Sequence, residues 1–387
     1  MYRIVYSAFG ILIYLQASLS MGHTLFHANI KDLRTSDLNL GGEQMLALQG
    51  LIAKQGMVPD ILNIQEIQYD LPSTQQPSSF LYGKNLGAFL ASSWPAHAPQ
   101  LQATSLFIRA NTGEHAKKDE AGHYCLKKEP SKEEALQLAD HQNFGLFPGQ
   151  YSSFVASRFK QATEVAAIAL KDLKWKEFNP EVSLSQFAVG SGEPVNPDIQ
   201  LFDKVFYSLP VIIDDQLTYI VSLHTVPYFH FGNPKTPNYA RNFDQLRFLS
   251  WYLHGDALGL QVDTDHLWEH YKVRPLPADA KYIVIGDLNV DIKDRPSTDE
   301  QLAFNSAKIL SSIISKGQIP FDLSQHTFDS GWLKKFFDYV IFSKHFELSN
   351  PVIWNQEKFA NAGEVSDHFA LSVNFKLPKK LHVSKEL

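Results

Sequence analysis

The sequence has almost no cysteine and no long basic run, and each shortage excludes a class of protein. Cys125 is the only cysteine, so an internal disulfide is impossible and stability must come from a packed core or bound metal. The formal net charge is −6, and basic residues gather only in the short tail at 376–385. This balance disfavours tight non-specific binding to nucleic acid, although it leaves a weakly binding nuclease open. A phosphate-bearing substrate would need a local positive group, such as a metal ion.

The one long apolar run lies at the N-terminus. Residues 1–23 read MYRIVYSAFGILIYLQASLSMGH, with one arginine, an apolar stretch and then the small residues Ala17, Ser18 and Ser20. This order is typical of a cleaved export signal, and the apolar stretch is short for a membrane span. We expect residues 1–20 to be a signal peptide and the protein to be exported, either to the periplasm or out of the cell. The alternative is a buried N-terminal strand or helix.

The rest of the chain has ordinary globular composition, 44% hydrophobic and 20% charged. Short apolar strands alternate with helical patterns, without a βαβ fingerprint, a repeat or a low-complexity linker. These features predict one α+β domain of two packed sheets over 21–376, and we expect a monomer without a stable membrane span. Insertions are expected near 70–145 and 229–280, the first as a long surface excursion with one helix near 131–140. A basic tail would follow at 377–387.

Several predicted strands border on polar residues. These are Asn29 after TLFHA, Glu66 after ILNIQ, His224 after YIVSL, Asp287 and Asn289 after YIVI, Asp338 within FFDYVIF, and Asp367 with His368 before FALSVNF. Charged groups beside buried strands are costly unless they are paired or bind metal. Carboxylate and amide oxygens suit Mg²⁺, with Mn²⁺ or Ca²⁺ as alternatives, and histidines beside carboxylates suit proton transfer. The pattern predicts metal-assisted attack of water on a phosphate ester.

Each of these signals is weak alone, because GDLN (286–289) is also a common turn sequence and His224 could simply cap a strand. The complete set in this order, however, resembles the endonuclease/exonuclease/phosphatase superfamily, which includes deoxyribonuclease I. The resemblance extends from Asn29 to His368, and FPGQYSSFVASRF (147–159) and RNFDQLRF (241–248) are similar to an exported bacterial branch. It implies a four-layer α/β/β/α sandwich, two sheets back to back with helices outside, and a site at one rim.

The resemblance also implies metal-binding and water-activating residues. Glu66 would be the principal metal ligand, with Asn29 hydrogen-bonding nearby. Asp367 would bind metal or pair with a histidine. Asp287 would orient the attacking water, and Asn289 would hold the phosphate oxygens.

The resemblance further implies roles for two histidines, and two other residues are candidates for binding the phosphate. His368 would polarise the scissile phosphate, while His224, oriented by Asp338, would protonate the leaving oxygen. Tyr151 and Arg241 are candidate phosphate ligands, although Tyr151 could instead pack under the sheet rim and Arg241 could be an ordinary surface arginine.

The sequence leaves the substrate open. Lys31 stands where abasic-site endonucleases carry a metal-binding aspartate, which favours the deoxyribonuclease-like or sphingomyelinase-like branches. Nucleic acid, phospholipid head groups and small phosphorylated metabolites remain as substrate classes, with a phosphodiesterase or nuclease as the leading interpretation. For a lipid substrate, aromatic residues in 80–94 or 226–232 would have to reach the membrane interface. A catalytically silent binding protein on the same fold is the alternative from another class.

Overall fold

The computed structural model describes residues 22–40, 42–69, 84–190 and 192–378. The predicted signal peptide at 1–20 and all but the first two residues of the predicted tail lie outside these residues. Among the described helices, none combines the length and apolarity needed to cross a membrane.

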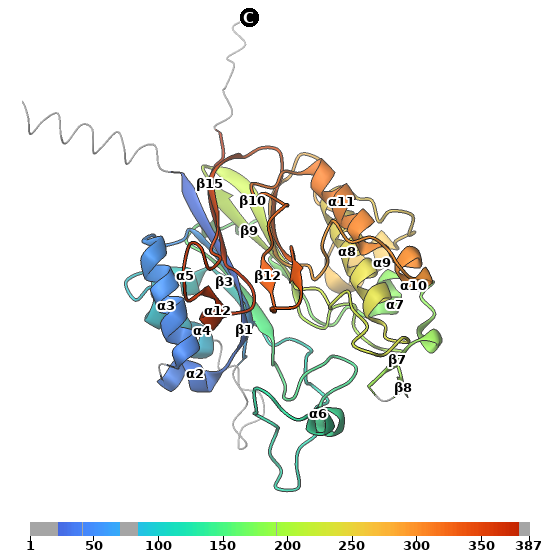
Figure 1. The fold of residues 1–387 in the computed structure, drawn as a ribbon. Coiled ribbons are helices and arrows are strands. Elements are labelled where there is room, and N and C mark those ends of the chain that lie inside the picture. Colours follow the sequence, from blue (N-terminus) through green and yellow to red (C-terminus); the bar gives the residue numbers. More distant parts are fainter. Residues whose placement is uncertain (1–21, 41, 70–83, 191, 379–387) are drawn as a thin grey trace, which may run out of the picture.

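Two six-stranded sheets lie face to face (Figure 1). In order across the first sheet, the strands are β15 (Glu347–Ile353), β16 (Leu371–Lys376), β1 (His23–Leu33), β2 (Ile61–Ile67), β4 (Ser152–Ser157) and β3 (Ser105–Ile108). In the second they are β14 (Asp338–Phe342), β11 (Lys281–Asp287), β10 (Gln216–Ser222), β9 (Phe206–Ile213) and β5 (Lys160–Gln161), with β6 (Ile168–Leu170) also paired to β9. Within each sheet one pair of strands is parallel, β1 with β2 and β10 with β11.

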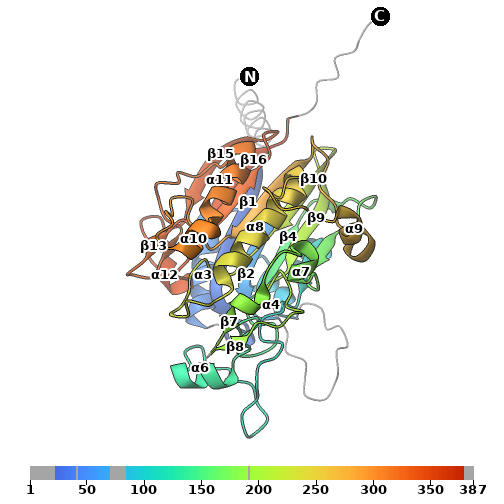
Figure 2. The same ribbon diagram turned by 90° about the vertical axis from the view of Figure 1, so that its right-hand side faces the viewer.

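Helices cover the outer face of each sheet, as Figures 1 and 2 show. On the first sheet these are α2 (Thr35–Leu40), α3 (Glu43–Gln55), α4 (Lys84–Ser93), α5 (Ala98–Ala103) and α12 (Ala362–Val365). On the second they are α7 (Trp175–Phe178), α8 (Asn238–His254), α9 (Thr264–Tyr271), α10 (Asp299–Ala303) and α11 (Ser306–Lys316). Smaller elements are α6 (Lys132–Leu138), a 3₁₀ turn at Leu184–Gln186, and the hairpins β7 (Ala188–Val189) with β8 (Glu193–Pro194) and β12 (Phe328–Asp329) with β13 (Lys334–Lys335). The predicted four-layer sandwich is confirmed.

Alternation along the strands explains the layers. On β1, Leu25 packs into the core shared by the two sheets, whereas Phe26 packs into the core beneath α3 and α4. Ile61 and Leu62 divide in the same way on β2. Because successive side chains point to opposite faces and both faces are covered, these strands appear in the sequence as continuous apolar runs.

Both predicted insertions contain parts of the core, so the first is not only the surface excursion that the sequence suggested. Residues 84–108 form α4, α5 and β3, and they bury Leu86, Phe89, Leu90, Leu101 and Phe107. Likewise, 229–280 contains α8, one of the most buried helices of the second layer. The apolar side chains of α4 recur at helical spacing, but the surrounding Pro- and Ser-rich composition obscured them. The helix expected near 131–140 is confirmed as α6, which begins with a Ser131–Glu134 capping box.

Candidate active site

Strand ends from both sheets meet at one rim. Asn29 on β1 lies opposite Gln65 on β2, and Asp287 on β11 lies opposite Asp338 on β14. His224 follows β10, the parallel neighbour of β11. Residues distant in the sequence converge here because their strands are neighbours.

Gly286 on β11 allows the chain that follows the neighbouring strand β10 to approach closely at this rim. Its φ is +155°, and a Cβ at this position would lie 1.8 Å from the Leu223 carbonyl oxygen. The Gln65 side chain links the sheets at the same point, since Nε2 donates to Leu223 O at 3.0 Å and Oε1 accepts from Asp287 N at 2.8 Å. The glycine of GDLN therefore has a steric purpose.

The first polar cluster holds two carboxylates around one amide. Asn29 Nδ2 donates to Glu66 Oε1 at 3.0 Å and to Asp287 Oδ2 at 3.1 Å. His224 Nε2 lies 3.4 Å from Asp287 Oδ2 and 3.9 Å from Glu66 Oε1. Glu66 occupies an irregularity in the β2–β4 register with φ +62°, a conformation that is strained for a non-glycine residue.

The second cluster is a buried chain of hydrogen-bonding groups. His368 Nδ1 lies 2.8 Å from Asp338 Oδ2, and the other Asp338 oxygen lies 3.1 Å from His27 Nε2. His27 Nδ1 lies 2.9 Å from Asn63 Oδ1, and Asn63 in turn donates to Ser222 Oγ at 2.6 Å. This chain crosses from one sheet to the other and leaves His368 Nε2 3.8 Å from Asp287 Oδ2.

The predicted pairing of Asp338 with His224 is wrong. Asp338 binds His368 and His27, whereas His224 Nε2 faces Asp287 and its Nδ1 is buried without a hydrogen-bond partner among the described residues. The register places Asp338 beside Asp287, and both oxygens of its carboxylate are already engaged by the two other histidines. The carboxylate-oriented histidine of this site is therefore His368.

Burial and neighbouring charges shift the pKa values of His224 and His368 in opposite directions. Burial lowers the pKa of His224 well below its ordinary value, and the positive Lys204 adds to this effect. Burial also disfavours a charged His368, but the Asp338 and Asp287 carboxylates raise its pKa to about 10. Burial raises the pKa of Asp287 to about 7, although His368 opposes the rise, and burial raises the pKa of Glu66 as well. These opposite pKa shifts favour a neutral His224 and a protonated His368.

Sequence reasoning missed His27 and the Asp203–Lys204 pair. His27 precedes Asn29 by two positions, so strand alternation could have placed both side chains on the same face. Lys204 Nζ donates to Asp203 Oδ2 at 2.7 Å, and both side chains are buried beside the cavity. The Asp203–Lys204 dipeptide lies shortly before β9, and no pattern in the sequence distinguished it.

Three further predicted residues lie near the clusters. Asn289 lines the cavity, where its Nδ2 donates to Thr225 O at 3.0 Å and its backbone N–H donates to Asp287 Oδ1 at 2.8 Å. Tyr151 also lines the cavity, and burial together with Asp32 and Glu66 raises the pKa of its phenol. Asp367 instead pairs with Lys31, with Oδ2 3.1 Å from Nζ, and belongs to neither cluster of potential metal ligands.

Arg241 is a structural cross-link, not the phosphate ligand that the sequence suggested. Its guanidinium is buried and donates to Leu201 O, Gln142 O, Gln200 O and Asn143 Oδ1, at 2.6 to 3.2 Å. It begins the second turn of α8 and points towards two segments, 142–143 and 200–201, whose carbonyl groups need donors. These bonds occupy most of its donors.

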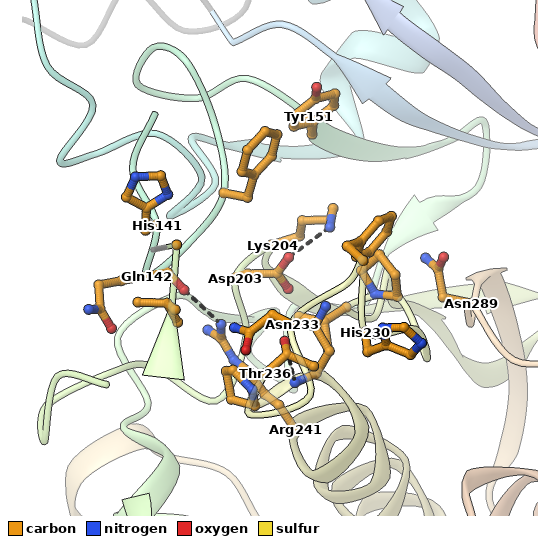
Figure 3. A pocket seen from close by; sticks show the side chains of 18 of the residues that line it. His141, Gln142, Tyr151, Asp203, Lys204, His230, Asn233, Thr236, Arg241 and Asn289 are labelled. Carbon is orange, nitrogen blue, oxygen red and sulfur yellow. Dashed lines mark hydrogen bonds and ion pairs between the residues drawn. The ribbon is translucent and has the colours of Figure 1, made fainter. Parts of the chain in front are cut away.

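A cavity of about 510 Å³ joins the clusters to the protein surface (Figure 3). Glu66, His224, Asp287, Asn289 and His368 lie in its lining. Figure 3 shows Tyr151, His141, Asn289 and Arg241 on different sides of the space. The predicted catalytic residues thus open onto one pocket, apart from the fully buried Asp338.

The first cluster fits a divalent cation. Ligand atoms of Glu66, His224 and Asp287 all lie within 4.8 Å of one another, and so do those of Asp287, Asp338 and His368. In the part of the chain that the structure describes, no lysine or arginine forms an ion pair with Glu66 or Asp287. A buried Asp287 and a half-buried Glu66 without such a partner are costly, and a bound cation would offset that cost.

Comparison with known proteins places the fold. A structure from Beutenbergia cavernae DSM 12333, titled endonuclease/exonuclease/phosphatase, is 14% identical with a TM-score of 0.51, covering 92% of this chain and 72% of that one. A family protein from Leptotrichia buccalis C-1013-b is 13% identical with a TM-score of 0.46, covering 92% and 99%. One from Bacteroides vulgatus is 10% identical with a TM-score of 0.45, covering 93% and 100%. No curated protein matches the chain.

A family model matches most of the chain. The model described as the Endonuclease/Exonuclease/phosphatase family matches residues 38–368, which is most of the chain. The match includes Glu66, His224, Asp287 and the terminal His368. The chain belongs to the endonuclease/exonuclease/phosphatase family.

Proposed function

We propose that this protein is a divalent-metal-dependent phosphodiesterase that cleaves its substrate by direct in-line attack of water. Members of the family generally hydrolyse phosphoester bonds and generally depend on divalent metal. The observation that carries the proposal is the meeting of Glu66, Asp287 and His224 in one cavity with the Asp338-bound His368. A catalytically silent protein would have no need to keep this costly arrangement of buried charge.

Glu66, Asp287 and His224 would hold the ion, with Mg²⁺ as the first choice and Mn²⁺ or Ca²⁺ as alternatives. When bound, it would supply positive charge to the phosphate oxygens. Asp367 is not needed in this ligand set, because its carboxylate pairs with Lys31.

The chain's own residues would do the rest. Asp287 Oδ1 is held by the Asn289 backbone N–H and Oδ2 by the Asn29 amide, so the carboxylate is fixed in place to orient the attacking water. His368, held by Asp338, would donate from Nε2 to the phosphate or to the leaving oxygen. Asn289 retains a second amide N–H for a phosphate oxygen, because Thr225 O takes only one. In this assignment His368 replaces His224 as the proton donor.

Hydrolysis of bis-p-nitrophenyl phosphate tests the proposal. Release of p-nitrophenol should require Mg²⁺, Mn²⁺ or Ca²⁺ and should stop when EDTA is added. An absence of turnover with all three metals would overturn it.

We also propose that residues 1–20 direct export, because they carry a charged start, an apolar run and small residues near the end. N-terminal sequencing of protein recovered from outside the cytoplasm should then begin near Met21. An intact Met1 on that protein would contradict cleavage.

A further inference from the structure

Beyond the catalytic residues, the cavity has an apolar outer wall. Leu136 on α6, Phe144 and Phe231 line it, and they are 44%, 53% and 68% exposed. Val189 and Pro237 also line the cavity. Large, exposed apolar side chains in the lining of a catalytic cavity mark a site for an apolar group.

The wall is built in advance of any ligand. Arg241 holds the loop at 142–143 and the segment at 200–201 with its guanidinium. Gln142 donates to Pro194 O at 3.0 Å, and Asn233 donates to Ala188 O at 2.8 Å, so the β7–β8 hairpin is tied to the loops on both sides. Figure 3 shows Gln142, Asn233 and Arg241 together on one side of the cavity. A preformed wall binds without a large loss of conformational entropy.

The charge of the cavity limits what enters it. Among its described lining residues the only lysines and arginines are Lys132, Lys204 and Arg241. Lys204 is paired with Asp203, and the Arg241 guanidinium is engaged by loop oxygens. Of these three side chains, only that of Lys132 is left to meet a second phosphate. A polyanion depends on several such cations, whereas a diester with one charge does not.

We infer that the substrate is a small, soluble phosphodiester with a single negative charge, one ester group of which is an uncharged aromatic or aliphatic group. That group lies against Leu136, Phe144 and Phe231 while the phosphate reaches Glu66, Asp287 and His368. A cavity of about 510 Å³ has the size of a small-molecule site. The inference rests on the proposed function, whose substrate class it narrows.

Calorimetry on the full chain with Mg²⁺ tests the inference with two probes, diphenyl phosphate and dimethyl phosphate. Both carry one charge, and they differ only in the apolar groups. Diphenyl phosphate should bind at least about tenfold more tightly, since burying one phenyl group has an effect of this size or larger. Phe144→Ala and Phe231→Ala should each weaken diphenyl phosphate several-fold and leave dimethyl phosphate unchanged. Leu46→Ala, an equally exposed apolar position on α3 at 58%, should leave both unchanged.

Several results would overturn the inference. Equal dissociation constants for the two probes, or diphenyl phosphate binding that ignores both phenylalanine variants, would show that the wall is not a binding surface. Plasmid DNA or phosphatidylcholine vesicles could also bind more tightly than diphenyl phosphate and lose that binding in Phe231→Ala. The substrate would then be a nucleic acid or a lipid, not a small soluble diester.

The hydrolysis assay on the same preparation separates the two claims. Turnover of bis-p-nitrophenyl phosphate without a preference between the probes retains the proposed function and rejects the substrate class. Selective binding of diphenyl phosphate without any turnover rejects the proposed function and retains the apolar pocket. Both phenylalanines are exposed, so the variants should fold, and their melting temperatures check this.

Discussion

His368 Nδ1 lies 2.8 Å from Asp338 Oδ2, a buried contact between the end of one sheet's edge strand and the loop that enters the other sheet. The opposite oxygen of Asp338 is held by His27 at 3.1 Å. With both oxygens engaged, the carboxylate cannot turn, and it fixes the ring of His368 towards Asp287. The orientation and the charge of His368 thus depend on Asp338, which does not line the cavity.

Asp338→Asn tests this dependence. The substitution keeps the shape but removes the charge that keeps His368 protonated, so kcat for bis-p-nitrophenyl phosphate should fall by about 100-fold with little change in KM. Asp214→Asn is the matched control, because Asp214 also pairs with a histidine, His23, at 3.1 Å but outside the site. Equal activity of the two variants would argue against a positioning role for Asp338.

Removal of the Glu66 charge should weaken metal binding. Glu66→Gln retains the size of the side chain and loses one of two carboxylates in the first cluster, so Mg²⁺ affinity measured by calorimetry should fall at least about tenfold. Glu347→Gln, an exposed position on β15, serves as the control. Unchanged affinity in Glu66→Gln would place the ion elsewhere.

Gly286→Ala should destabilise the protein. The added Cβ would meet Leu223 O at 1.8 Å, in backbone that follows the neighbouring strand β10, and would lie 2.8 Å from Gln65 Nε2 of the other sheet. We expect a loss of about 1–3 kcal/mol in the free energy of unfolding by urea. Gly87→Ala on α4, where the nearest atom would be at 3.8 Å, should be neutral or slightly stabilising. Equal unfolding midpoints for the two variants would contradict the close approach at Gly286.

His254 should make the protein less stable as pH falls. Burial lowers its pKa from 6.5 to about 4, with Lys316 adding to the effect and Asp256 opposing it, beside the ring of Tyr282. Between these values the unfolded chain binds a proton that the folded chain does not, so this contribution is complete above pH 6.5 and is lost towards pH 4. The melting temperature of His254→Gln should therefore fall less than that of wild type between about pH 7 and about pH 4.5. Parallel pH profiles would exclude the effect.

The sequence predicts which residues reach the site better than it predicts how they pair. Glu66, Asp287 and His368 border apolar strands, so their meeting at one rim follows from strand order and from resemblance. The partner of Asp338 follows from the register of β11 with β14 and from the approach of the other sheet, neither of which a strand pattern contains. Arg241 lies on a helix, and its hydrogen bonds depend on two segments that are distant in the sequence, 142–143 and 200–201. For Asp338 and Arg241, the local sequence pattern does not indicate which residues their side chains contact.

The most direct test of the central claim is the metal-dependent hydrolysis of bis-p-nitrophenyl phosphate by wild type and by Asp287→Asn. Asp287 accepts bonds from Asn29 and Asn289 and lies within 4 Å of both His224 and His368, so its charge should matter more than that of any neighbour. The account predicts p-nitrophenol release that requires a divalent metal and falls by at least about 100-fold in the variant. Turnover that persists in EDTA, or that Asp287→Asn leaves unchanged, would contradict it.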